Sequence, residues 1–139
     1  MKKIFLLFMS IAVLSSCSND DDSSGNSENN ILGTWGLVEI NNAGDFLIPV
    51  NECTSQSQIT FNSDGTAISE YYMNTDGECT VDSEEGNWSG GGNNDKYIFR
   101  IPILGSQPGR VDFNDDYSRF TFYPDALMTQ NTHIIFEKK

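Results

Sequence analysis

Basic residues, histidine and long apolar runs are scarce in this sequence. Its 139 residues include 8 Lys and Arg against 20 Asp and Glu, which gives a formal net charge of −12, and they include one histidine. Because a nucleic-acid-binding protein needs a basic patch, this composition argues against a nucleic-acid partner. No apolar run approaches the roughly 20 residues that a transmembrane helix needs, so we expect none.

Metal ligands and catalytic motifs are scarce too. The sequence has three cysteines, no C-x-x-C pair and only His133 as a histidine, so we expect no metal and no cofactor. It has no Gly-x-Ser-x-Gly elbow and no Gly-rich phosphate loop with a lysine. Alternation puts His133 on the strand face opposite Ile134 and Phe136, where a surface-lying, structural histidine is expected. The sequence therefore predicts a protein that is not an enzyme.

The first seventeen residues are arranged like an export signal. Two lysines precede an apolar stretch at 4–14, which is about the length of the apolar region of a signal peptide. The stretch "LSSC", which ends at Cys17, resembles a bacterial lipobox. The resemblance implies a signal peptide at 1–16 and lipid on Cys17 as the membrane anchor. An ordinary secretory signal that contains a cysteine, or a short membrane anchor, is the alternative.

Residues 17–30 are polar and acidic, with three aspartates at 20–22 and no apolar residue after Cys17. Such a segment cannot bury enough surface to fold, so we expect a flexible tether. In lipoproteins of the Bacteroidetes group, acids directly after the lipidated cysteine resemble a signal for export to the cell surface. The alternative is a solvated tether that carries no export signal. We expect an outer-membrane lipoprotein, on the periplasmic face or the cell surface.

The two remaining cysteines, Cys53 and Cys79, fall within residues 31–139, which we interpret as one domain. Two thiols in a small exported domain predict one disulfide. In the chain-entropy model this bridge would contribute roughly 3 kcal/mol. Two free thiols are the alternative.

Apolar residues alternate with polar residues along most of this domain, which is typical of strands with one buried face. Turn signals separate the strands, notably at 62–65 and 74–77. Strands are expected near 33–40, 57–62, 66–73, 79–83, 86–89, 96–103, 109–114, 118–123 and 132–137, and the two pieces within 79–89 can join into one bent strand. The sequence therefore predicts an all-β, antiparallel, up-and-down barrel of eight strands, whose closure removes exposed edges.

The expected inward positions carry large side chains. They are Trp35, Leu37, Ile59, Phe61, Trp88, Tyr97, Phe99, Ile101, Val111, Phe113, Phe120, Phe122, Ile134 and Phe136. An eight-stranded barrel is just wide enough to be filled by its side chains or to hold one small ligand. Both a packed interior and a ligand cavity stay open at this point.

Several segments carry a family resemblance in a fixed order: "LGTWGLVEI" at 32–40, then "ITFNSDGT", "EGNWS", "RFTF" and "IIFEKK". This order resembles the lipocalin-like domain of small Bacteroidetes lipoproteins, over residues 31–139. Gly33 and Trp35 match the Gly-x-Trp of the first lipocalin strand. The resemblance implies that Trp35 closes one barrel end beneath a basic residue of the last strand. Lys138 or Lys139 would take that place, where arginine is usual.

The resemblance also implies a function. We expect a monomeric, lipid-anchored protein that binds a small apolar ligand or an envelope component without catalysis. A ligand would enter opposite Trp35, past Tyr71, Tyr72, Tyr97 and Phe99, whose rings can stack on it. The alternative is a structural or interaction lipoprotein with a filled barrel, which contacts a protein partner through its loops.

Overall fold

The computed structural model describes residues 30–41, 50–91, 95–101 and 105–139. Cys17 and the expected signal peptide at 1–16 lie outside the described residues, as do residues 17–29 of the expected tether. The expected end of the sixth strand, at 102–103, also lies outside them. The bounds of these segments stay predictions.

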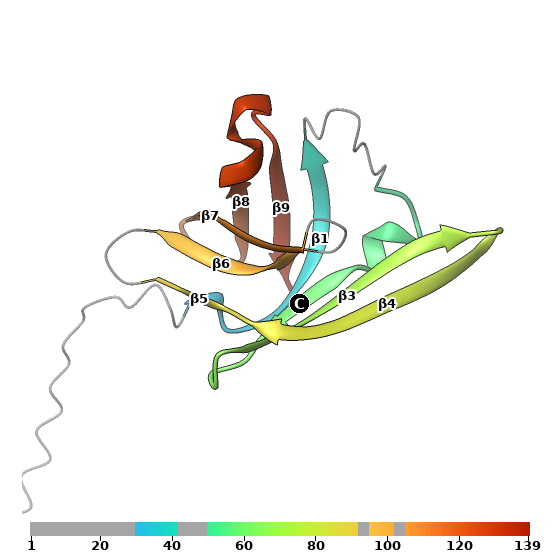
Figure 1. Cartoon of the computed structure of the whole chain (residues 1–139), viewed down its shortest axis with the longest axis horizontal. Coiled ribbons are helices and arrows are strands. Elements are labelled where there is room, and N and C mark those ends of the chain that lie inside the picture. The colour runs from blue at the N-terminus through green and yellow to red at the C-terminus, as the bar shows by residue number, and fades with distance from the viewer. Residues whose placement is uncertain (1–29, 42–49, 92–94, 102–104) are drawn as a thin grey trace, which may run out of the picture.

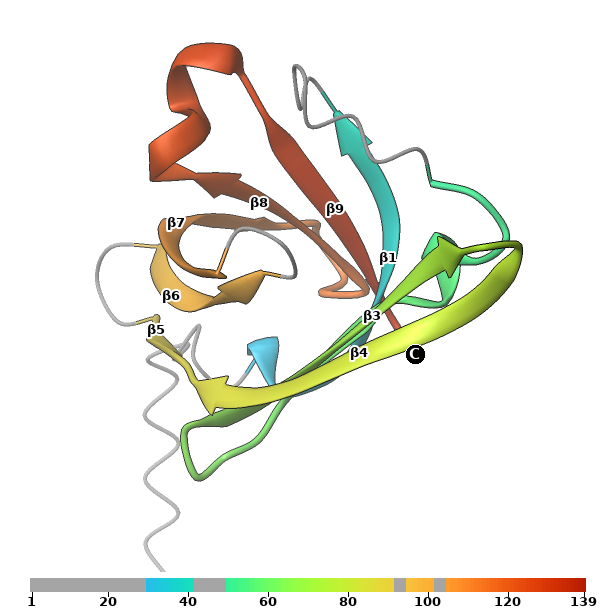
Figure 2. The same ribbon diagram turned by 45° about the vertical axis from the view of Figure 1, so that its right-hand side comes forward.

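In the described part of the chain, nine antiparallel strands form one sheet in which nearly every strand pairs with its neighbours in sequence (Figures 1 and 2). The strands are β1 (Gly33–Asn41), β2 (Gln58–Phe61), β3 (Thr66–Thr75), β4 (Glu78–Asn87), β5 (Ser89–Gly90), β6 (Lys96–Ile101), β7 (Gly105–Phe113), β8 (Arg119–Pro124) and β9 (His133–Lys138). Two short 3-10 helices are η2 (Thr54–Gln56) and η3 (Asp125–Gln130). The order is β4-β3-β2-β1-β9-β8-β7-β6-β5, which confirms the all-β, up-and-down prediction.

The barrel is nearly closed because the chain bends between β4 and β5. No backbone ladder joins these two strands to each other. β4 and β5 lie at opposite ends of the sheet order, yet only Trp88 separates them along the chain. They are the bent strand expected within 79–89, counted as two because the bend interrupts the pairing. At the bend, the Trp88 backbone N–H donates to the Gly65 carbonyl at 2.8 Å.

The expectation that closure removes every edge is wrong. Among the described residues, β4 pairs only with β3, and β6 pairs with β7 and the two-residue β5. Side chains of β3 and β4 reach β6 instead. The Ser69 hydroxyl donates to the Arg100 carbonyl at 2.9 Å, and the Arg100 guanidinium pairs with Glu84.

The long β3–β4 hairpin has a turn that suits its twist. Asp76 and Gly77 have φ of 54° and 90°, as a two-residue type I′ turn requires. The Gly77 N–H also donates to the Asn74 side chain at 3.1 Å. Gly65, with φ of 84°, has the left-handed conformation expected at 62–65. Both turn predictions are confirmed.

The interior of the barrel is apolar and packed with rings. Every expected inward residue is buried except Trp88 and Phe113, which are partly buried and pack against the core. Ile31 and Ala67 belong to the core as well, although alternation did not single them out.

Edge-to-face and tilted ring pairs run through this core. Phe99 lies 5.1 Å from Phe61 and 4.5 Å from Phe122, centroid to centroid. Phe120 lies 4.8 Å from Trp35 and 4.9 Å from Phe136. These spacings are those of aromatic rings in direct contact.

Candidate functional site

Trp35 lies in β1, two residues after Gly33. This side chain is fully buried, and its indole N–H donates to the Ile31 carbonyl at 2.6 Å. The Lys138 Nζ lies 5.3 Å from the centroid of the Trp35 ring, because Trp35 and Lys138 are paired between β1 and β9. Gly33 begins β1 with φ of 113°, a conformation that side chains rarely adopt. The structure thus brings these three residues together, and their role in closing one barrel end stays a prediction.

The four residues expected to line a ligand opening do not form one wall. Tyr97 and Phe99 are fully buried, and a Cβ on Gly90 would lie 2.4 Å from the Tyr97 ring, so β5 covers that ring. Tyr71 is 5 % exposed on the inner face, where burial raises the pKa of its hydroxyl.

Tyr72 points the other way. It is half-buried and is paired with the exposed Val81 of β4. Neighbours on a strand alternate between faces, so Tyr71 and Tyr72 cannot both line the interior. The assignment of Tyr72 to the lining is therefore corrected.

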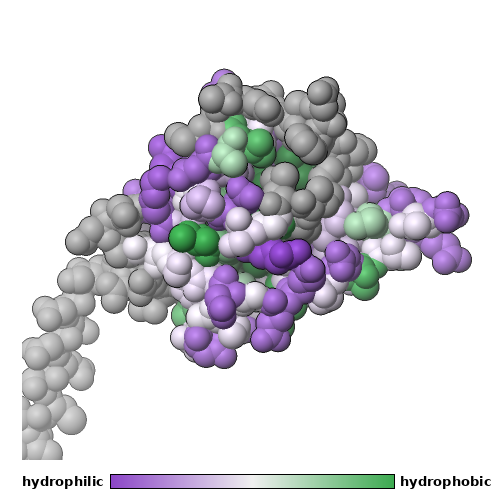
Figure 3. Space-filling view, in the orientation of Figure 1, coloured by the Kyte–Doolittle hydropathy of each residue, from purple (hydrophilic) through white to green (hydrophobic). Residues whose placement is uncertain are grey.

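The hairpin of β3 and β4 is the most exposed part of the sheet. It extends beyond the rest of the barrel (Figures 1 and 2), because β2 starts at Gln58, opposite Glu70, and gives the outer part of β3 no second partner. Its surface near the turn is mostly hydrophilic, as the right-hand end of Figure 3 shows. On β4, all residues except Gly86 are exposed.

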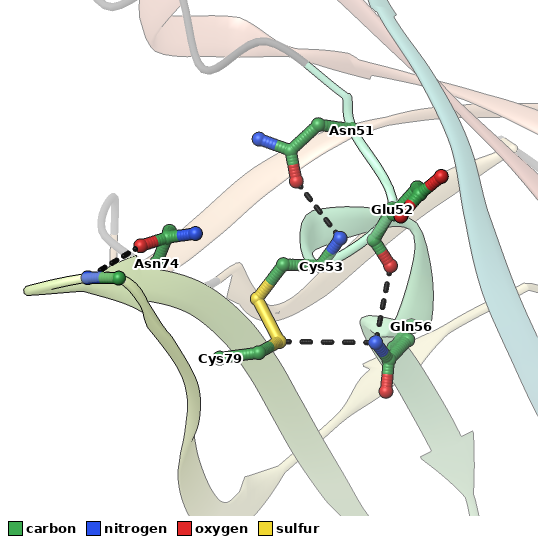
Figure 4. Close-up of a pocket in the computed structure, with 7 residues that line it drawn as sticks. Asn51, Glu52, Cys53, Gln56, Asn74 and Cys79 are labelled. Carbon is green, nitrogen blue, oxygen red and sulfur yellow. Dashed lines mark hydrogen bonds between the residues drawn. A yellow bond between two sulfur atoms is a disulfide. The ribbon is translucent and has the colours of Figure 1, made fainter.

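A disulfide between Cys53 and Cys79 braces this hairpin (Figure 4). It ties the chain just before η2 to the start of β4 across 26 positions in sequence, as the sequence predicts. The Gln56 side-chain amide lies beside the disulfide. It donates to the Glu52 backbone carbonyl at 3.0 Å and contacts the Cys79 sulfur at 3.7 Å. The brace thus holds the hairpin against η2.

An open polar depression of about 550 Å³ lies over the brace. Its lining residues, six of them labelled in Figure 4, are Asn51, Glu52, Cys53, Gln56, Asn74, Gly77 and Cys79. Asn51 is already engaged, since its side-chain oxygen accepts from the Cys53 and Thr54 backbone N–H groups at 2.9 and 3.0 Å. The depression therefore presents a preordered polar surface.

Only the two cysteines of this site were singled out from the sequence. The amides around them were missed, because isolated Asn and Gln residues carry no motif. Glu84 and Glu85 were predicted to lie in a solvated turn, which is wrong, because both belong to β4. The one available signal was the acidic run at 82–85, in a segment without the apolar alternation of the other strands.

His133 lies at the start of β9, half-buried as expected for a residue near the surface. Its Nε2 accepts from the Asn41 side-chain amide at 3.0 Å, and its Nδ1 donates to the Asn131 carbonyl at 3.2 Å. The Tyr123 ring lies 5.7 Å away, centroid to centroid. Both ring nitrogens are occupied, so the arrangement holds the strand start in place.

Two further findings concern the part of the chain that the structure describes. It contains no group of three or more His, Cys, Asp or Glu side chains that could hold a metal ion. None of its helices has the length and apolar content needed to cross a membrane.

Comparison with known proteins gives two matches. Residues 31–103 match the model of the lipocalin-like domain. Residues 1–18, which include Cys17, match the model of the prokaryotic membrane lipoprotein lipid attachment site. No curated protein matches the chain.

Proposed function

Because this chain belongs to the lipocalin-like domain family and carries a lipoprotein lipid attachment site, we propose that it is a membrane-anchored, non-catalytic recognition protein that binds a protein partner through its outer surface. In this proposal, a lipocalin-like domain is held at a membrane and presents its outer surface to the partner. It differs from the small-ligand carriage that the family resemblance implies.

The packed aromatic interior carries this proposal. Rings from β2, β6 and β8 meet in the middle of the barrel, where Phe61, Phe99 and Phe122 form a continuous series of contacts. A ligand cavity there would require these rings to move apart and lose their contacts. This ring packing supports recognition by the exterior over carriage of a small apolar molecule.

The exposed hairpin is the best candidate for the recognition surface. The disulfide and the hydrogen bonds around Gln56 and Asn51 order it before any partner arrives. Preordering lowers the conformational entropy that binding costs. The absence of a role in catalysis is part of the proposal, and it is supported by the two hydrogen bonds that occupy the His133 ring.

The anchor is proposed to be lipid on Cys17 in the outer membrane, with the acidic residues 20–22 at the start of the tether. Cys17→Ser is expected to abolish labelling by radioactive fatty acid and to release the protein into the soluble fraction. Ser18→Ala is the matched control and should leave both unchanged. Protease treatment of intact cells then separates the cell surface from the periplasmic face. Retention of lipid label by Cys17→Ser would contradict the anchor.

Native mass spectrometry of the full lipidated chain, offered a lipid extract of the source cell, tests the filled barrel. We expect the mass of the lipoprotein alone, with unchanged fluorescence from Trp35 and Trp88. A stoichiometric apolar molecule that survives desolvation would overturn the proposal in favour of a carrier.

A further inference from the structure

The outer edge of β4 is a long, regular and unpaired strand edge. β4 runs in unbroken register with β3, from Thr75 opposite Glu78 to Thr66 opposite Asn87. The type I′ turn makes Thr75 and Glu78 a hydrogen-bonded pair, and such pairs alternate along an antiparallel ladder. Within the described chain, the backbone N–H and C=O groups of Val81 and the alternate residues on either side therefore face the open edge.

The two faces of this edge differ in chemistry. Residues that are directly opposed on two strands share a face. Asp82 lies opposite the buried Tyr71, and Glu84 opposite the buried Ser69, so both carboxylates are on the inner face. Val81, 49 % exposed, lies on the outer face. A strand added here would meet Asp82 and Glu84 on one face, and the apolar Val81 beside Ser83 and Glu85 on the other.

The charge at the edge is only partly balanced. Arg100 pairs with Glu84, whereas in the part of the chain described here no ion pair involves Asp82 or Glu85. The whole chain has a net charge of −12, and its tether is acidic as well. Like charges thus oppose the pairing of this edge with a second copy or with the protein's own tether.

We propose that the β4 edge binds an extended, basic segment of a partner protein, which adds to the sheet as a further strand. The inference rests on the proposed function, since it names the partner chemistry of that exterior surface. Main-chain hydrogen bonds along the edge give affinity, as in other cases of strand addition. Lysine or arginine at alternate positions faces Asp82 and Glu84, and the intervening apolar residues face Val81.

The shape of the edge supports binding over mere protection. Sheet edges that resist pairing are short, carry charged side chains, or are interrupted by a bulge or a proline. β4 has only the second of these features. β4 has ten residues, no proline and no shift in register, whereas the β1–β9 pairing has an irregularity between Leu37 and Glu39. The Cys53–Cys79 bridge also fixes the start of β4. The acids on this edge therefore select the charge of the partner without blocking the addition of a strand.

Peptide binding to the full lipidated chain in detergent tests the inference. The probe is a peptide of about eight residues, a usual strand length, that alternates lysine with valine or threonine. One comparison peptide has the same charge and two central prolines, which cannot join a ladder. Another has glutamate in place of lysine. We expect only the first peptide to bind and to slow amide hydrogen exchange at Val81, Ser83 and Glu85.

Protein variants locate the contact. Val81→Pro removes one N–H from the free edge, where proline is tolerated, and Val81→Thr is its matched control. The double variant Asp82→Asn, Glu84→Gln removes both carboxylates of the inner face and is expected to weaken binding about tenfold, as the loss of two exposed charge pairs predicts. Glu39→Gln on β1 removes a carboxylate from a strand that is already paired and should leave affinity unchanged.

The outcomes separate this inference from the proposed function. Equal binding of the proline peptide, or protection of amides outside β4, would overturn strand addition. Equal affinity of the double variant and the Glu39→Gln control would overturn the basic partner. A small molecule retained in the barrel contradicts the proposed function whatever the peptides do, whereas an empty barrel with no peptide bound contradicts only this inference.

Discussion

The β8 strand and the β4 strand share one antiparallel sheet, yet they use their side chains in opposite ways. Along β8, buried residues alternate with more exposed ones, and Phe120 and Phe122 are fixed in the core. Along β4, no side chain is buried at all. The difference shows that the barrel wall is held by apolar burial, whereas the hairpin is held by its turn, its ladder and one disulfide. Stability thus depends on the barrel wall, and the proposed recognition surface lies on the hairpin.

The largest predicted effect comes from removing a ring of the barrel wall. Phe120 contacts Trp35 and Phe136, so Phe120→Ala is expected to lower the free energy of unfolding by about 3–5 kcal/mol. Val81→Ala, on the exposed side of the hairpin, should change it by less than about 0.5 kcal/mol. Urea unfolding followed by tryptophan fluorescence measures both. Similar losses of unfolding free energy in the two variants would show that the hairpin is stabilised by apolar burial in the same way as the barrel wall.

Removal of the bridge is the next largest change. The Cys53→Ser, Cys79→Ser double variant should lose about 3 kcal/mol, since the unfolded chain regains the freedom of the closed loop. Hydrogen exchange of the native state should quicken in β3 and β4 near the turn and stay slow in β8. Faster exchange throughout the barrel would contradict a local brace.

The sequence predicted the wall better than the hairpin, for a physical reason. Alternation reports burial, so it found almost every residue of the wall, as with Phe99 and Phe122. The hairpin buries neither face of β4, so the strands were expected to end near 73 and begin near 79, while β3 reaches Thr75 and β4 starts at Glu78. The turn itself was found, because Asp-Gly is a local signal.

The candidate site was predicted only at its cysteines. Tyr72 was assigned to the wrong face because a cluster of aromatic residues outweighed the strand period. The pair between Arg100 and Glu84 was not anticipated, since it depends on how far β4 and β6 approach across the open side. Such contacts come from the curvature of the sheet, which no local pattern encodes.

Two glycines give a sharper form of the comparison. A Cβ on Gly109 in β7 would lie 2.5 Å from both the Phe122 ring and the Tyr123 carbonyl oxygen, so Gly109→Ala is expected to cost about 1–3 kcal/mol. Gly86→Ala in β4 adds a Cβ with no heavy atom within 4 Å and should be neutral or slightly stabilising. Thermal unfolding of the pair measures the contrast. A larger loss of stability in Gly86→Ala than in Gly109→Ala would contradict the finding that β7 is crowded at Gly109 and β4 is open at Gly86.

The smallest predicted effect concerns two turns with the same hydrogen-bond pattern, in which an aspartate accepts from the residue two positions later. Asp64 accepts from the Thr66 hydroxyl and backbone N–H at 2.7 and 2.9 Å, and Asp116 accepts from the same groups of Ser118 at 2.6 and 3.0 Å. The hydroxyl hydrogen bond, and then the backbone one, lowers the pKa of each carboxyl below its ordinary value of 3.8.

A lowered pKa in the folded state fixes the direction of the pH dependence. The folded protein holds these carboxyls ionised more readily than the unfolded chain, so their stabilising contribution is full above the ordinary pKa. It is lost as pH falls from about 4 through the lower folded-state value. Asp64→Asn and Asp116→Asn should therefore each flatten the loss of stability in acid, as measured by urea midpoints across that range. Thr66→Val and Ser118→Ala should raise the pKa of the adjacent carboxyl in an NMR titration. An unchanged acid slope in both Asn variants would mean that the two turns do not sense pH.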